Sequence, residues 1–186
     1  MEAFIAIIIV QLVLIIAALM QFIESTFIHE WGHLRTARLY EYTKAEITLK
    51  FAIPLFSIKG CEVKRDKTLK SEGHIWLENE YAPYTDLQIR DIAIAGAHYA
   101  AKFCLLVGIT ELVIIYVLVF NFLAGSEYEF VGLVDIVLSF VVTILFTFLQ
   151  EIKYRTAKEE WCDRNIANNQ AGFKEYLRRE KVKEND

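Results

Sequence analysis

The chain of 186 residues has little proline and few histidines, and two long stretches contain no basic residue. It has 2 prolines, the first of them Pro54, so none interrupts a helix in residues 1–53. No Lys or Arg occurs in residues 1–34 or 103–152. The 3 cysteines are odd in number and widely spaced, which gives no indication of a disulfide framework. A net charge of −4 without a basic stripe argues against nucleic-acid binding.

The stretches without basic residues are strongly apolar and have the length of membrane spans. The chain is 55% hydrophobic with a mean hydropathy of +0.31, too apolar for an ordinary soluble domain. A helix needs about 20 apolar residues to cross a bilayer, and the windows 3–28, 103–123 and 131–150 provide them. Because the first window is long and only Glu2 precedes it as a charge, we expect a span and not a cleaved signal peptide.

The charge distribution predicts how the spans are oriented. All 20 Lys and Arg residues lie in two blocks, 35–102 and 153–183, while the loop at 121–130 carries acidic residues only. Positive loops face the cytoplasm. We therefore expect a multi-pass integral membrane protein in the lipid bilayer, with its N-terminus outside and its C-terminus cytoplasmic.

The fold class we predict is a mainly α, polytopic membrane protein with a small sheet. Residues 1–151 form the membrane-embedded core, and 41–90 form a cytoplasmic sheet and loop within it. Alternating side chains at 45–51 and again at 56–64 predict a β-hairpin or small sheet after the first helix. It either covers a site or pairs with an extended substrate strand. Residues 152–186 form a cytoplasmic tail with one short amphipathic helix.

A metal-binding motif lies at the end of the first apolar run. His29-Glu30-Trp31-Gly32-His33 is an H-E-x-x-H sequence that holds half of the 4 histidines. On a helix, positions i and i+4 share one face, so His29 and His33 can bind one Zn²⁺ while Glu30 acts as general base. The competing interpretation is a pair of surface histidines beside a solvated glutamate. His74 and His98 are expected to be a surface histidine and a polar group at a helix contact.

A catalytic zinc usually has three protein ligands, and the motif provides two. Glu111 and Asp135 are ionisable groups within the second and third spans, where such groups are often functional. We expect Asp135 near the outer face, far from the motif. Glu111 lies roughly 12 Å from the cytoplasmic end of its span at 1.5 Å per residue, within reach of the motif.

The motif and its surroundings resemble the site-2 protease family of intramembrane zinc metalloproteases. His29 to His33 followed by Ala37 gives H-E-x-G-H-x-x-x-A at the cytoplasmic end of a span, and an Ala-Gly-Ala stretch stands where the family commonly has Ala-Gly-Pro. The resemblance implies a third ligand from an Asp on or near the third core span, commonly in Leu-Asp-Gly. No Asp-Gly occurs here, and Asp163 is the best match. The alternatives are Glu111, Glu151, Asp135 and Cys162.

The resemblance implies a zinc-dependent endopeptidase that hydrolyses a peptide bond in a membrane-associated substrate near the cytoplasmic face. Its catalytic residue would be Glu30, and its metal ligands His29, His33 and Asp163. A different membrane zinc protease would use Glu111 as third ligand. The non-enzymatic alternative is an inactive membrane adaptor that keeps the protease fold. A di-iron oxidase is disfavoured because such sites need more than the 4 histidines present. The oligomeric state stays open.

Overall fold

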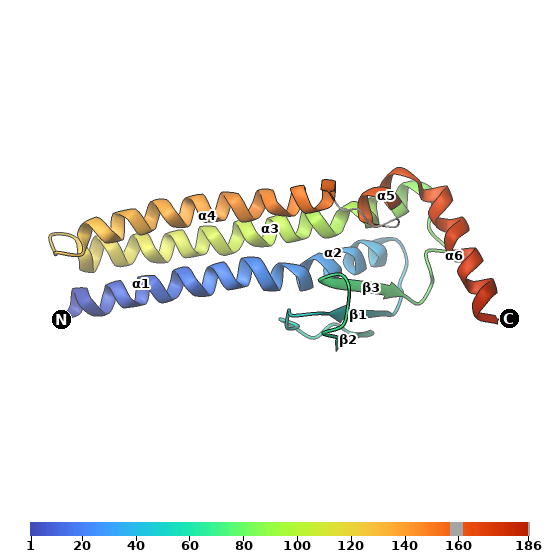
Figure 1. Ribbon diagram of the computed structural model, residues 1–186, viewed down its shortest axis with the longest axis horizontal. Coiled ribbons are helices and arrows are strands. Elements are labelled where there is room, and N and C mark those ends of the chain that lie inside the picture. Colours follow the sequence, from blue (N-terminus) through green and yellow to red (C-terminus); the bar gives the residue numbers. More distant parts are fainter. Residues whose placement is uncertain (157–161, 186) are drawn as a thin grey trace.

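The computed structural model describes residues 1–156 and 162–185 and is mostly helical, with a small sheet at one end (Figure 1). The first helical rod joins α1 (Glu2–Leu19), the π-helical turn η1 (Met20–Glu24) and α2 (Ser25–Tyr40). The second joins α3 (Asp86–Leu118) and η2 (Val119–Leu123), and the third is α4 (Glu129–Thr156). In the described residues these 3 helices are long and apolar enough to cross a membrane, which confirms that part of the predicted fold.

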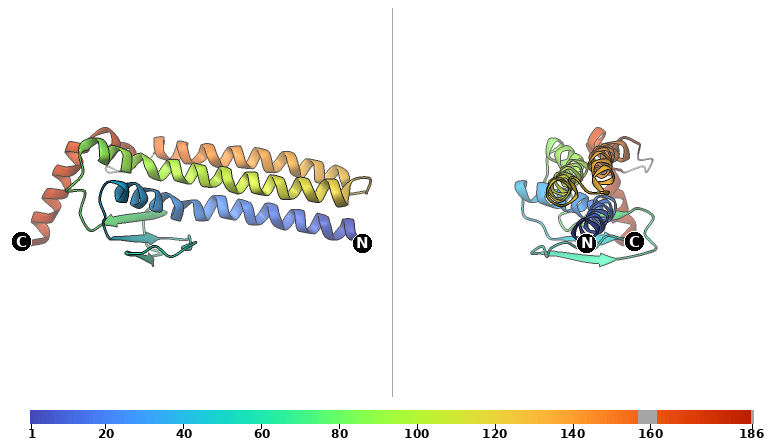
Figure 2. Two further views of the ribbon diagram at one scale, coloured as in Figure 1. Left: turned by 180° about the vertical axis from the view of Figure 1, so that it is seen from behind. Right: turned by 90° about the vertical axis from the view of Figure 1, so that its left-hand side faces the viewer.

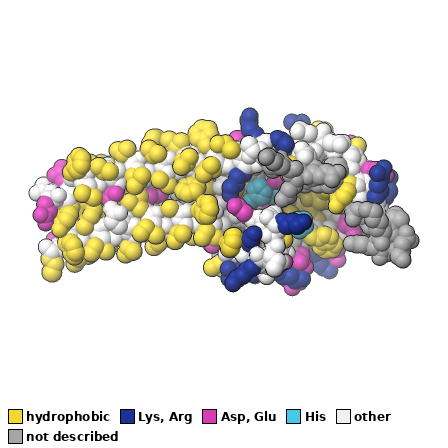
Figure 3. Space-filling view, viewed as in Figure 1, with side chains coloured by type: hydrophobic (Ala, Val, Ile, Leu, Met, Phe, Trp, Pro, Cys, Tyr) yellow, Lys and Arg dark blue, Asp and Glu magenta, His cyan; other side chains and the backbone are white. Residues whose placement is uncertain are grey.

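The surface of the helices is apolar over most of their length. Side chains such as Leu12, Ile16 and Phe140 are more than half exposed. Figure 3 shows hydrophobic atoms covering the helical bundle, whereas Lys and Arg gather at the end that carries the sheet. An exposed apolar band of this kind matches a lipid environment. The orientation of the termini stays a prediction.

Small residues and a few polar contacts hold the three rods together. A Cβ on Gly32 of α2 would lie 3.0 Å from the carbonyl oxygen of Ala95 on α3, so these two helices approach closely where we expected them to. Between the first rod and α4, the Gln11 side chain donates to Asp135 Oδ2 at 2.6 Å. Hydrogen bonds between helices can replace water where a bilayer offers none.

The sheet contains β1 (Ala45–Leu49), β2 (Cys61–Arg65) and β3 (Gly73–Leu77) in the order β2-β1-β3. β1 pairs in parallel with β2 and antiparallel with β3. The predicted small sheet is therefore confirmed, whereas its hairpin form is wrong for the first two strands, because the connection between them returns the chain to the end where β1 began. Arg38 supports that return by donating to the carbonyls of Lys59 and Gly60, each at 2.9 Å.

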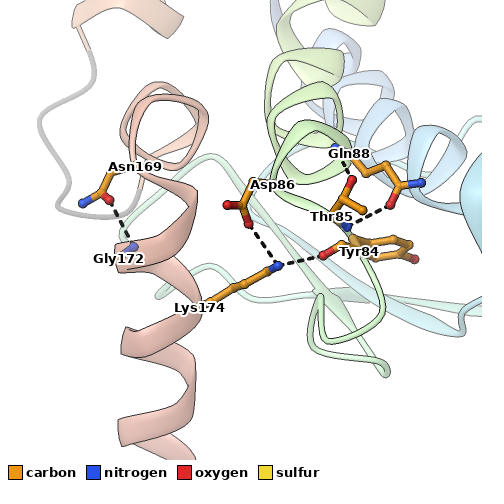
Figure 4. Close-up of polar contacts among 7 residues, drawn as sticks. All are labelled: Tyr84, Thr85, Asp86, Gln88, Asn169, Gly172 and Lys174. Atoms are coloured by element: carbon orange, nitrogen blue, oxygen red, sulfur yellow. Dashed lines mark hydrogen bonds and ion pairs between the residues drawn. The ribbon is translucent and has the colours of Figure 1, made fainter.

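The tail folds back onto the body and contains α5 (Asp163–Asn168) and α6 (Gln170–Asn185), not one helix. Figure 2 shows α6 at the end of the molecule opposite the N-terminus. Ile166 and Phe173 are buried in the core that the sheet forms with α2 and α3. Lys174 Nζ donates to the carbonyl of Tyr84 at 2.8 Å and pairs with Asp86 at 3.1 Å (Figure 4). The tail is thus fastened to the start of α3.

Candidate metal centre

Helix α2 carries His29, Glu30 and His33 into the space beneath the tail. The two imidazole rings lie one turn apart on one face, with centroids 4.8 Å apart and planes at 80°. The side chain of His33 is only 4% exposed and that of His29 is 25% exposed. The predicted helical face therefore exists, and the pair is not a solvated surface pair.

Asp163 approaches both rings from the start of α5. Its Oδ2 lies 2.9 Å from His29 Nε2 and 3.3 Å from His33 Nε2. One donor atom from each of the three residues lies within 4.8 Å of the other two, and this is the cluster of possible metal ligands in the described residues. The structure brings together the three side chains that the resemblance implied as ligands.

The other candidates for the third ligand lie outside this cluster. Asp135 contacts Gln11 within the bundle, and Glu111 is buried between the spans. Glu151 is exposed and pairs with Arg155 at 2.7 Å. Cys162, the residue before α5, is buried, but its sulfur does not belong to the ligand cluster.

Both remaining histidines are exposed. His74 belongs to β3, whereas His98 belongs to α3. Neither joins the possible metal ligands in the described part of the chain. The histidine pair of the H-E-x-x-H motif is therefore the pair available to a metal here.

A hydrogen bond from the backbone orients His33. Its Nδ1 lies 2.6 Å from the carbonyl oxygen of Ile92 on α3. A carbonyl can only accept, so Nδ1 carries a proton, and Nε2 is the ring nitrogen that faces Asp163 and would bind a metal once it has lost its own proton. Metal-binding histidines usually have such a partner on the second ring nitrogen, because it fixes the tautomer and the ring orientation.

Two glycines leave the space that the cluster needs. A Cβ on Gly96 of α3 would lie 2.4 Å from His33 Nε2 and 2.7 Å from His29 Nε2. A Cβ on Gly73, the first residue of β3, would lie 2.7 Å from Glu30 Oε1. Any side chain at either position would displace a ligand or the carboxylate, so α3 and β3 approach the motif with bare backbone.

A cavity of about 790 Å³ opens beside the cluster. Glu30 lines it and is 7% exposed. Figure 3 shows histidine in a hollow at the border between the apolar bundle and the charged end. The walls come from α2, from the whole of β3, from the end of α4 and from the tail, including Thr26, Ser71, Gln150, Lys153, Tyr154, Ile166, Phe173 and Leu177.

Electrostatics favours the carboxylate form of Asp163. Burial opposes its ionisation, but the imidazoles of His33 and His29 outweigh burial and hold the pKa of the carboxyl well below its usual range. A deprotonated carboxylate is the form that binds a metal. Asp163 is therefore already in the state that a cation requires.

Comparisons of the chain with protein-family models, with curated proteins and with solved structures found no match. The described residues form a helical protein with 3 apolar, span-length helices and a His-His-Asp cluster at one end of them. Two imidazole nitrogens and one carboxylate oxygen form a donor set that suits Zn²⁺, and three protein ligands leave a fourth position open. The oriented Nε2 of His33 and the bare backbone at Gly96 also fit such an ion.

Proposed function

We propose that the chain is a zinc-dependent endopeptidase of the site-2 protease family, cleaving a membrane-associated substrate near the cytoplasmic face. The observation that carries this proposal is the His29, His33 and Asp163 cluster next to the buried Glu30 carboxylate, in a cavity at the end of apolar helices. The two histidines and Asp163 would hold the ion.

Zn²⁺, when bound, supplies Lewis-acid chemistry that makes water acidic and a carbonyl electrophilic. The chain itself provides the proton transfer. Glu30 lies one residue after His29 on the same helix, and bare backbone at Gly73 leaves space beside its Oε1. Its carboxylate would take a proton from the attacking water and later return it to the amine that leaves.

The edge of the sheet offers a place for an extended substrate. Lys50 N donates to the carbonyl of Glu72 at 3.0 Å, so the alternate residues Gly73, Ile75 and Leu77 direct their backbone groups to the other edge of β3. β3 is an edge strand, and these three residues line the cavity. A substrate strand added here would pass Glu30. A substrate helix must first unwind, since its carbonyls are engaged in its own hydrogen bonds.

The test compares the wild-type protein with Glu30→Gln and His33→Ala, all purified in lipid nanodiscs. The substrate probe is a library of synthetic peptides, each one membrane-spanning helix with its juxtamembrane segment, with products read by mass spectrometry. We expect one zinc per wild-type chain and cleavage of a subset of peptides. Glu30→Gln should keep the zinc and lose cleavage, and His33→Ala should lose both.

The adaptor alternative predicts a different pattern. A wild-type protein that cleaves no peptide, together with full function of Glu30→Gln in cells that depend on the protein, would refute the peptidase proposal. The adaptor would then be the better description.

A further inference from the structure

Tyr81 lines the catalytic cavity but has no part in zinc binding or proton transfer. It lies in the turn between β3 and α3, in a cavity shared with His29, Glu30, His33 and Asp163. A tyrosine at this place can donate a hydrogen bond to a substrate without carrying a charge. That property makes its position worth analysing.

The backbone at this turn is strained. Glu80 has φ 48° and Tyr81 has φ 60°, so two consecutive residues with side chains adopt the left-handed conformation. Such strain persists where the surrounding structure enforces it, often at active sites. Two glycines would relieve the strain but would provide no side chain for the cavity.

The ring of Tyr81 is held from two sides. Its centroid lies 6.1 Å from the ring of Tyr84 and 5.2 Å from the ring of Phe173 on α6, both in edge-on geometry. The backbone N of Tyr81 donates to Asn79 Oδ1 at 3.3 Å. These contacts fix the ring and the backbone, whereas its hydroxyl makes no hydrogen bond to the residues that the structure describes.

The phenol also lies within the field of the catalytic groups. Burial raises the pKa of Tyr81, and the carboxylates of Asp163 and Glu30 raise it further. The hydroxyl therefore keeps its proton at neutral pH and stays a donor. Tyr81 lines the same cavity as the ligand cluster and the general base.

We propose that the Tyr81 hydroxyl donates a hydrogen bond to the carbonyl oxygen of the scissile peptide as negative charge develops there. This inference rests on the proposed peptidase function. The water oxygen bonds to the carbonyl carbon, the π pair moves to the carbonyl oxygen, and Glu30 takes the proton. The pair then re-forms the carbonyl, the C–N bond breaks, and the nitrogen receives that proton. Tyr81 keeps its own proton throughout.

The experiment measures cleavage of the peptide cleaved best by the wild-type protein. Removing one donor of this kind lowers kcat by about 100- to 1,000-fold, and we expect that loss in Tyr81→Phe with little change in KM and none in zinc affinity. Affinity for a phosphinic peptide, which mimics the charged tetrahedral state, should fall by a similar factor. The matched control is Tyr84→Phe, which removes a hydroxyl held by Asn79 outside the cavity and should lower thermal stability while kcat stays.

Three results would overturn the inference and leave the peptidase proposal standing. These are wild-type kcat in Tyr81→Phe, a loss of zinc affinity that accounts for its lower activity, or a kcat loss that appears in Tyr154→Phe instead. Tyr154 is the phenol that lines the cavity from α4. Absence of cleavage by the zinc-loaded wild-type protein would overturn both proposals.

Discussion

Gly96 is the residue at which a single methyl group should test the metal centre most directly. Alanine suits a helix better than glycine by about 1 kcal/mol, so Gly96→Ala would stabilise α3 if the position were only structural. For the ligand cluster, the structure predicts that the same substitution is disruptive. The new Cβ would lie 2.4 Å from His33 Nε2, 2.6 Å from its Cε1 and 2.7 Å from His29 Nε2.

The magnitude follows from these distances. Carbon and nitrogen atoms that are not bonded prefer separations of about 3.5 Å or more, so an imidazole must move by roughly 1 Å. Distances between zinc and its ligand atoms vary by only about 0.2 Å. At least one Zn–N bond should therefore fail. Since the loss of an outer partner alone weakens metal binding by about 10- to 100-fold, we expect at least the upper end of that range in Gly96→Ala.

Zinc affinity would be measured by competition with a chromophoric chelator on the full chain in nanodiscs, with helix content followed by circular dichroism. Gly108→Ala on the same helix is the matched control. Its Cβ would crowd Thr143, in the bundle, so it should lower stability by about 1–3 kcal/mol and leave zinc affinity unchanged. Wild-type zinc affinity in Gly96→Ala would refute the placement of the ion between the two histidines.

Three further variants test other parts of the structure. In the same chelator assay, Asp163→Ala should lower zinc affinity at least as far as Gly96→Ala does, whereas Glu151→Ala should leave it unchanged. If Asp163→Ala and Glu151→Ala bound zinc equally well, Asp163 would not be a ligand. Gln11→Leu should lower the free energy of unfolding in detergent by about 0.6–1.7 kcal/mol, because it takes a hydrogen bond from a buried carboxyl, and a more stable variant would contradict that role. Lys174→Met should speed amide exchange in residues 163–177, read by mass spectrometry, and unchanged exchange would show that other contacts hold the tail.

The sequence predicted the long helices well because a membrane span depends on one local property, a run of apolar side chains. It predicted the start of α3 poorly. Charged residues such as Arg90 and Asp91 lie before the apolar window, yet the helix begins at Asp86. A local signal was present, because Thr85 and Gln88 form a capping box that marks a helix start.

Strand pairing was harder, since it depends on contacts between distant segments. β1 and β2 alternate as strands should, but nothing local distinguishes a hairpin from a parallel pair joined by a returning loop. β3 was not predicted, because its five residues lie within a polar stretch in which their alternation is hard to recognise. Its alternation is visible afterwards, with Leu77 buried and Trp76 exposed.

The candidate metal centre also has a part that local sequence predicts and a part that only the fold shows. The spacing of His29 and His33 is local, so the sequence alone placed both on one helical face. Asp163 is 134 positions from His29, and no periodicity connects them. Three predicted spans put the tail on the same side as the motif, which reduced the choice of ligand but left several acids and a thiol open. Only the fold shows which of these candidate side chains lies next to the two histidines.

The tail has more influence on the site than its place at the end of the chain suggests. α5 has 6 residues, too short to be a stable helix alone, so its position depends on burial of Ile166 and on the anchoring of α6. One docking event brings Asp163 to the histidines and presses Phe173 against Tyr81. The tail therefore provides both the proposed third ligand, Asp163, and one of the two rings that hold Tyr81. A change that loosens the tail should impair zinc binding and turnover jointly, while the spans and the histidine pair stay in place.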